Sequence, residues 1–145
     1  TFTNGVQLNE SSLEDALTIM RTWKNAAGLP IQVNAKKLLL PPARVFDAKR
    51  IIDNPNRSGT GNRDIGVIHH DNYIPDGVIV NPFIVNPKSW FLISDEMNGF
   101  KAFVREKLFF DDQGDIDAFN YTVKGIERYS MYYSNFRCVF GSAGA

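Results

Sequence analysis

Apolar residues recur at helical spacing near the N-terminus. Intervals of three and four predict an amphipathic helix over about residues 13–27, whose apolar stripe consists of Leu13, Ala16, Leu17, Met20 and Trp23. Ser11-Ser12-Leu13-Glu14 has the form of a capping box, so we expect the helix to begin there. Gly28 can adopt the left-handed conformation that ends a helix. We interpret the Trp and Met of the stripe as core residues.

A short apolar run, Lys37–Leu40, leads into two prolines. Pro41 cannot donate a hydrogen bond to a neighbouring strand, and Pro42 suits the first position of a helix. The pattern therefore predicts a strand followed by a helix from Pro42 to Ile52. The polar stretch Asn54–Asp64 that follows is predicted to be a solvent-facing loop.

From Ile65 onward, short apolar runs alternate with turn residues. We predict strands at Ile65–His70, Val78–Val80, Trp90–Ser94 and Phe100–Arg105, and a turn at Asp111–Asp115. Beyond that turn, apolar and polar residues alternate as in long antiparallel strands with one covered face; the apolar positions are Phe119, Tyr121, Val123, Tyr129, Met131 and Tyr133. Such an aromatic sheet fits either an edge awaiting a neighbour or an ordinary core face.

Composition narrows the class of protein. The 145 residues are 43% hydrophobic, which indicates one or two small packed domains, and a second unit is predicted to begin near Arg105. Acidic and basic residues number 16 each and the basic ones are scattered, which argues against a nucleic-acid surface. The sequence contains neither an apolar run of membrane-spanning length nor a secretory signal, so we expect a soluble chain made in a cytoplasm.

Four groups contain residue types that occur in catalytic or ligand-binding sites, but none of them predicts catalysis. Ser58–Asp64 is rich in glycine but lacks the Gly-Lys-Ser/Thr ending of a phosphate-binding loop. His69 and His70 would point to opposite faces of a strand, so they are unsuited to ligating one metal. Cys138, the single cysteine, is predicted to be a small buried or half-buried hydrophobe. The acidic residues Asp111, Asp112, Asp115 and Asp117 lack the terminal Glu of an EF-hand. We therefore predict no enzyme activity, no catalytic residue, no metal and no cofactor.

Five segments occur in an order that resembles a known family. They are the Gly28-Leu29-Pro30 step, the strand into Pro41-Pro42, the Val80-Asn81-Pro82 turn, the Trp90-Phe91-Leu92 strand, and an arginine-containing end, Tyr121–Val139. Together they resemble the C-terminal part of major capsid proteins of tailed bacteriophages with the Hong Kong ninety-seven phage fold, over about residues 11–141.

The resemblance implies an α+β fold in which a mixed α/β axial domain, residues 1–104, is followed by the long antiparallel strands of a peripheral domain, residues 105–145. It implies a structural protein that assembles into pentamers and hexamers of an icosahedral head and encloses double-stranded DNA without binding it specifically. The implied partners are other copies, with scaffold, portal or decoration proteins, and no membrane. The implied location is the virion capsid, after synthesis in the host cytoplasm.

The resemblance also suggests contacts around the capsomer axis for Asn54, Arg57, Arg63 and Asp64 in the polar loop, where complementary charge would join copies. A merely solvated loop is the alternative. The N-terminal arm, extended loop and spine helix of the family do not occur in these residues, so the upstream half is either a separate chain or not included. No crosslinking lysine or asparagine is identified.

A second interpretation is a small α/β ligand-binding or enzymatic domain with a pocket near Asn54 to His70, lined in part by His69. It accounts for the same strands and helices. It does not supply the convergent nucleophile, base and anion-binding groups that an active site needs.

Overall fold

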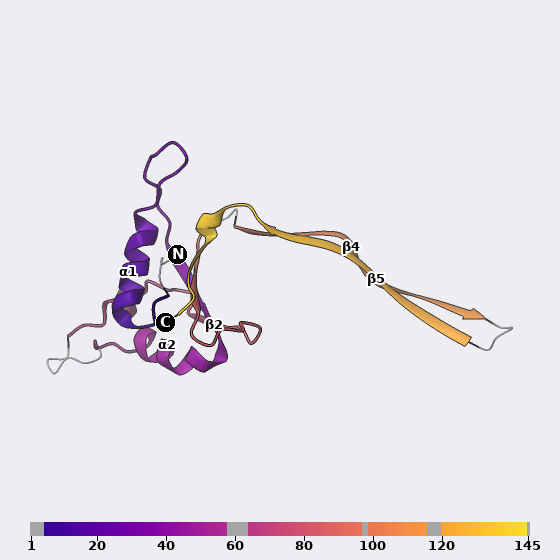
Figure 1. The fold of residues 1–145 in the computed structure, drawn as a ribbon, viewed down its shortest axis with the longest axis horizontal. Coiled ribbons are helices and arrows are strands. Elements are labelled where there is room, and N and C mark those ends of the chain that lie inside the picture. Colours follow the sequence, from indigo (N-terminus) through magenta and orange to yellow (C-terminus); the bar gives the residue numbers. More distant parts are fainter. Residues whose placement is uncertain (1–4, 58–63, 97–98, 116–119, 145) are drawn as a thin grey trace. The chain divides into compact units, whose positions relative to one another are not determined.

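The computed structural model describes residues 5–57, 64–96, 99–115 and 120–144. The chain divides into two compact units (Figure 1). Unit 1 comprises Thr1–Met97 and Arg137–Ala145, and unit 2 is Asn98–Phe136. The last residues therefore return to unit 1. The assignment of residues 1–104 and 105–145 to axial and peripheral domains stays a prediction.

Unit 1 contains a four-stranded sheet with the order β2-β1-β3-β6. Its strands are β1 (Ala35–Leu40), β2 (Val78–Val80), β3 (Trp90–Ser94) and β6 (Val139–Ser142). β1 and β2 are parallel, whereas the other two pairings are antiparallel. The parallel pair is connected through η1 (Pro42–Arg44), α2 (Val45–Ile52) and α3 (Val67–His70), because parallel neighbours need a crossover rather than a tight turn. The predicted α+β class is confirmed.

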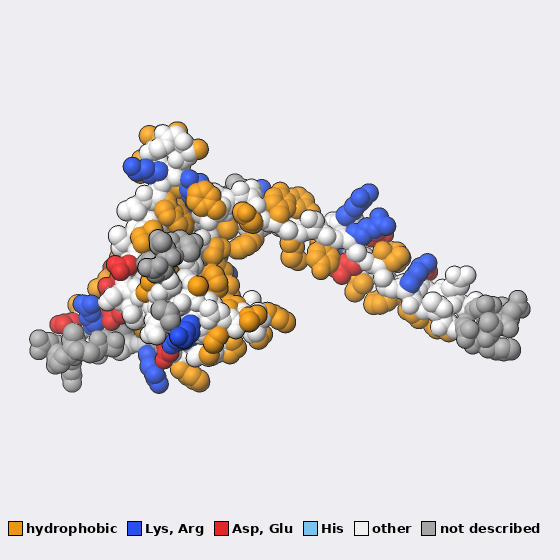
Figure 2. Space-filling model, viewed as in Figure 1, with side chains coloured by type: hydrophobic (Ala, Val, Ile, Leu, Met, Phe, Trp, Pro, Cys, Tyr) orange, Lys and Arg blue, Asp and Glu red, His pale blue; other side chains and the backbone are white. Residues whose placement is uncertain are grey.

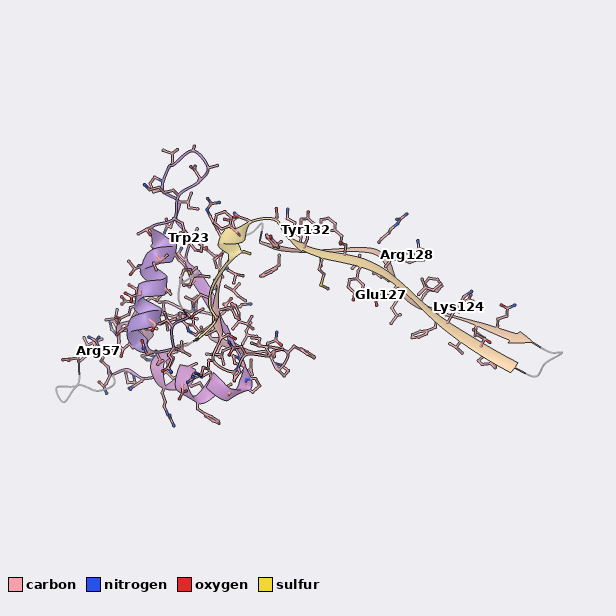
Figure 3. The ribbon with its side chains drawn as sticks, viewed as in Figure 1. Trp23, Arg57, Lys124, Glu127, Arg128 and Tyr132 are labelled. Carbon is pink, nitrogen blue, oxygen red and sulfur yellow. The ribbon has the colours of Figure 1, made fainter. Side chains whose placement is uncertain are left out.

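One face of this sheet forms the core. Leu38 lies opposite Leu92, which lies opposite Phe140, so a single apolar row crosses three strands. All three side chains are fully buried, and they share one cluster with the stripe of α1 (Glu10–Arg21). The predicted stripe is confirmed for the four buried residues Leu13, Ala16, Leu17 and Met20. Trp23 lies beyond the end of α1 (Figure 3), and its ring centroid is 6.2 Å from that of Phe140.

The boundaries predicted for the first helix were wrong at both ends. Asn9 is the N-cap, since its side-chain oxygen accepts a hydrogen bond of 2.7 Å from the Ser12 amide. The Ser12 hydroxyl donates to Asn9 and to the Gln7 carbonyl, so it is not itself the cap. The helix ends at Arg21 because Asn25 organises a separate turn by accepting hydrogen bonds from the amides of Ala27 and Leu29. Gly28 does adopt a positive φ of 80°, but within that turn.

Replacing Asn9 with alanine is expected to lower the free energy of unfolding by about 1 kcal/mol, because the Ser12 amide loses its acceptor. Denaturant unfolding of the variant measures the loss. The matched control is Gln32→Ala at an exposed loop position, which should change stability by less than about 0.5 kcal/mol. Equal stabilities of the two variants would contradict the cap assignment.

The strand predicted at Ile65–His70 is wrong, whereas those at Val78–Val80 and Trp90–Ser94 are confirmed. Ile65 makes only an isolated bridge with Asn56, and Val67–His70 form the short helix α3. The place beside β1 is occupied by β2, so this segment has no strand to pair with. It instead buries Ile68 in the core of unit 1.

Unit 2 is an antiparallel ribbon of two strands, β4 (Phe100–Asp115) and β5 (Asn120–Tyr133). The prediction of long antiparallel strands is confirmed, but the turn predicted at Asp111–Asp115 is wrong because β4 continues through it. Polar cross-strand partners keep this acidic run in the ladder: Asp111 forms an ion pair of 2.7 Å with Lys124, and Asp112 accepts a hydrogen bond of 2.6 Å from the Tyr121 hydroxyl. Phe119 and Asp117 lie outside the described residues. After β5, η2 (Phe136–Cys138) leads into β6.

Candidate assembly surfaces

The ribbon formed by β4 and β5 exposes large apolar side chains on both of its faces (Figure 2). The single covered face predicted from the alternation is therefore wrong, because the described residues of unit 2 form no further helix or strand that packs on either face. Exposed on the ribbon are Phe100, Phe103, Val104, Leu108, Phe109, Phe110, Tyr121, Val123, Tyr129, Met131, Tyr132 and Tyr133. Extended apolar patches are uncommon on monomeric proteins, so this surface is a candidate binding surface.

Cross-strand pairs organise the ribbon where it begins. Phe100 lies opposite Tyr133, and Val104 lies opposite Tyr129, on one face. On the other face the rings of Phe103 and Tyr132 stack, with centroids 5.4 Å apart (Figure 3). These pairs fix the rings relative to one another. A partner would therefore meet an ordered apolar surface.

Two shifts of register interrupt the ribbon midway. They flank Glu106, which pairs with Arg128 through an ion pair of 3.3 Å. Such bulges bend a strand and increase its twist. Beyond them the Phe110 ring lies against Gly125, where a Cβ atom would come within 3.2 Å of the ring. Gly125 thus allows Phe110 to lie flat across the neighbouring strand.

The second face of the sheet in unit 1 is also apolar. It presents Leu39, Phe91, Ile93 and Val139, which are all half-buried. A cavity of about 470 Å³ lies along this face and is lined in part by Phe91, Val139 and Gly141. This face is a second candidate for contact with another chain.

The polar loop predicted to meet the capsomer axis is held closed at its base. The Arg57 amide donates to the Asp64 carbonyl at 2.7 Å, and the Asn54 side chain accepts from the Asn56 amide at 3.0 Å. The Arg57 guanidinium also lies 3.8 Å from Glu10 of α1 (Figure 3). The structure thus joins Arg57 to Asp64, whereas the side chain of Asn54 contacts Asn56. Arg63 lies outside the described residues, and the axial contact stays a prediction.

The ligand pocket predicted near Asn54 to His70 has only a partial counterpart in the structure. Val67 and Ile68 line a cavity of about 180 Å³ against α1, and a neighbouring cavity of about 340 Å³ is lined in part by Asp71 and Tyr73. His69 lines neither, and its Nδ1 atom lies 3.1 Å from the Ile52 carbonyl oxygen. Within the described ranges, no group of three His, Cys, Asp or Glu side chains could hold a metal ion. The two histidines lie on a short helix and not on the predicted strand.

Cys138 is buried, as predicted. Burial raises the pKa of its thiol, the negative charge of Glu96 raises it further, and a backbone hydrogen bond opposes the rise. On the ribbon, the pKa of Tyr121 is also raised, chiefly by its hydrogen bond to Asp112. Each pKa shift favours the protonated form in the folded chain.

The Cys138 thiol should have a lower pKa in the unfolded chain than in the folded chain. Below the pKa of the unfolded chain, about 8.5, the protonated thiol contributes fully to the stability of the folded chain. This contribution is lost as the pH rises through the higher pKa of the folded chain. We expect the melting temperature of the wild-type protein to fall between about pH 8 and pH 10 more steeply than that of Cys138→Ala. Parallel slopes in thermal melts of the two proteins would contradict this.

Two exposed apolar residues, Phe83 and Val85, were not singled out from the sequence. They lie between Asn81-Pro82 and Asn86-Pro87, which were interpreted only as turns. The available signal was the short apolar run Phe83-Ile84-Val85 between two Asn-Pro steps. None of the helices in the described part of the chain is long and apolar enough to span a bilayer.

Comparison with known proteins identifies a similar fold and a matching family. The fold is similar to that in the crystal structure of a virus-like particle from Pyrococcus furiosus, with a TM-score of 0.55 and 14% sequence identity. The similarity covers 97% of this chain and 57% of the other, so this chain spans little more than half of that one's length. The comparison with curated proteins found no match. Residues 1–73 match the model of one family, and the chain belongs to that family, the Mu-like prophage major head subunit gpT family.

Proposed function

We propose that this chain is part of a structural capsid protein that assembles with copies of itself. The observation that carries the proposal is the ribbon, whose apolar side chains are exposed on both faces. An isolated two-stranded hairpin is marginally stable in water, so a ribbon of this length needs a covering surface. In a shell, neighbouring elements and neighbouring copies supply that cover. Membership in a major head subunit family supports the same role.

The finer proposal follows the resemblance to the Hong Kong ninety-seven phage fold. Unit 1 corresponds to the axial domain and the ribbon to the peripheral domain, and the copies form pentamers and hexamers of a head that encloses double-stranded DNA. The net charge of zero suits this role, because a strongly basic inner surface would bind the packaged DNA. Scaffold, portal or decoration proteins are further partners in this proposal, and the virion capsid is its location. We infer that no enzymatic step is involved.

We also propose that the closed loop carrying Asn54, Arg57 and Asp64 contacts the neighbouring copy around the capsomer axis. The ion pair between Arg57 and Glu10 and the hydrogen bond between Arg57 and Asp64 order its base before any contact forms. An ordered base lowers the conformational entropy that is lost when the residues of the base dock.

The test is negative-stain electron microscopy of the full-length protein, with light scattering after size-exclusion chromatography. We expect rings of five or six copies, or closed shells. A strictly monomeric protein at high concentration, across several salt conditions, would overturn the proposal. It would direct attention to ligand binding at the cavity beside Val67 and Ile68.

A further inference from the structure

The loop of residues 81–89, which follows β2, holds two apolar side chains out in solvent. Phe83 is 88% exposed and Val85 is 96% exposed. The loop is nevertheless well ordered by hydrogen bonds: the Asn81 side chain accepts from the Phe83 amide at 2.9 Å, and the Asn86 side chain accepts from the Lys88 amide at 3.0 Å. Asn86 also donates to the Ala143 carbonyl at 2.6 Å, which ties the loop to the chain after β6. Docking of Phe83 would therefore cost little loop entropy.

A hollow of complementary character lies elsewhere on unit 1. It has a volume of about 180 Å³ and lies between α1 and α3. It is lined by charged, polar and apolar residues, which are Glu14, Leu17, Thr18, Arg21, Val67, Ile68 and Tyr73. The Arg21 guanidinium carbon lies 4.7 Å from the centre of the Tyr73 ring, which orders that wall. An apolar cavity of about 150 Å³ is large enough to bind benzene. The hollow therefore has room for one phenyl ring.

Each site carries a side chain whose charge is opposite to one at the other site, although Arg21 in the hollow offsets the charge of Glu14. Lys88 lies on the exposed part of the 81–89 loop, and Glu14 lines the hollow. Among the residues that the structure describes, neither side chain has an oppositely charged partner within 4.0 Å. A contact between copies that brings these two side chains together would therefore add an ion pair.

Figure 1 shows α1, which contributes to the lining of the hollow, on one side of unit 1 and the segment after β2 on the other. A copy cannot fill its own hollow with its own Phe83. A contact between the loop of one copy and the hollow of the next is heterologous, and such contacts close into rings when the rotation between copies is right. This geometry is what a capsomer requires.

We propose that the 81–89 loop of one copy docks on the neighbouring copy, with Phe83 in the hollow lined by Leu17, Val67 and Tyr73 and with Lys88 facing Glu14. The occupant of the hollow is thus a second copy of this chain. The inference rests on the proposed capsid function, since it names the contact that joins copies within one ring.

The first test replaces both exposed apolar residues of the loop, Phe83→Ser with Val85→Ser, in the full-length protein. We expect the concentration needed for ring or shell formation to rise at least about tenfold, as for loss of a central interface residue. The control is Phe46→Ser, a 74% exposed aromatic position on α2 outside the proposed contact, which should assemble as wild type does. Normal assembly of the double variant, beside an assembling wild type, would overturn the inference and leave the capsid function standing.

The second test uses charge reversal, which does not depend on removing apolar surface. Lys88→Glu and Glu14→Lys should each raise the assembly concentration a few-fold, and the two together should restore it. A combined variant that assembles no better than the worse single variant would overturn the pairing. If wild type itself forms no assembly, the proposed function fails, and this inference fails with it.

Discussion

Replacing four apolar ribbon residues with threonine, Phe100, Val104, Tyr129 and Met131, is expected to abolish shell formation while unit 1 stays folded. All four side chains are exposed in the isolated chain and lie on one face of the ribbon, in or beside the cross-strand pairs. Burying such a side chain contributes about 1.5–3 kcal/mol. Each 1.4 kcal/mol, roughly, corresponds to a factor of ten in affinity, so the loss of all four side chains should weaken the contact by far more than tenfold. Threonine keeps the preference for strand structure, so the ribbon itself is not the target of the change.

The measurement is electron microscopy of the purified variant, with circular dichroism to confirm that unit 1 is folded. The matched control replaces two exposed charged residues of the same ribbon, Lys107→Thr and Glu127→Thr. The control should still assemble, because surface charges contribute little to affinity. Closed shells from the fourfold variant would mean that the apolar ribbon is not an assembly surface.

The largest effect on folding is expected for Phe140→Ala. Phe140 is fully buried at the end of the row that begins with Leu38 and Leu92. Truncating a buried phenylalanine costs about 3–5 kcal/mol, whereas a whole domain of ordinary stability unfolds with about 5–15 kcal/mol. Urea unfolding of the variant should therefore show its midpoint reduced by a large fraction, or a chain that is already unfolded.

A milder change keeps this prediction measurable if the alanine variant does not fold. Phe140→Leu retains most of the apolar volume and should lose only part of that stability. The control Phe46→Ala removes an aromatic ring that is 74% exposed, so its stability should change by less than about 0.5 kcal/mol. Equal losses at positions 140 and 46 would show that the row across β1, β3 and β6 is not the centre of the core.

Local chemistry determined several elements of unit 1 without any knowledge of the fold. The apolar stripe of α1 follows from spacing alone, and Pro41-Pro42 ends β1 and begins η1 because proline lacks an amide hydrogen. The likeness to capsid proteins was also visible in sequence, and the family match over residues 1–73 supports it. The capsomer contact of Asn54, Arg57 and Asp64 stays a prediction, although the structure does join Arg57 to Asp64.

The helix and strand boundaries depended on competition between neighbours. Asn9, rather than a serine of the predicted capping box, caps α1 because its oxygen reaches the Ser12 amide. The segment after Ile65 became a helix because β2 takes the place beside β1. In both cases two local patterns were possible, and contacts made elsewhere in the chain selected one.

The sequence by itself determined the periodicity of α1, the strand and helix around Pro41-Pro42, and the apolar alternation of β5. Only the tertiary structure decided which apolar faces are covered: it buries the row ending at Phe140 and leaves Phe83 and the ribbon exposed. The physical reason is that periodicity is encoded by adjacent residues, whereas burial depends on which distant segments pack against them. Strands β3 and β6, for example, pair with each other although the whole ribbon lies between them in the sequence.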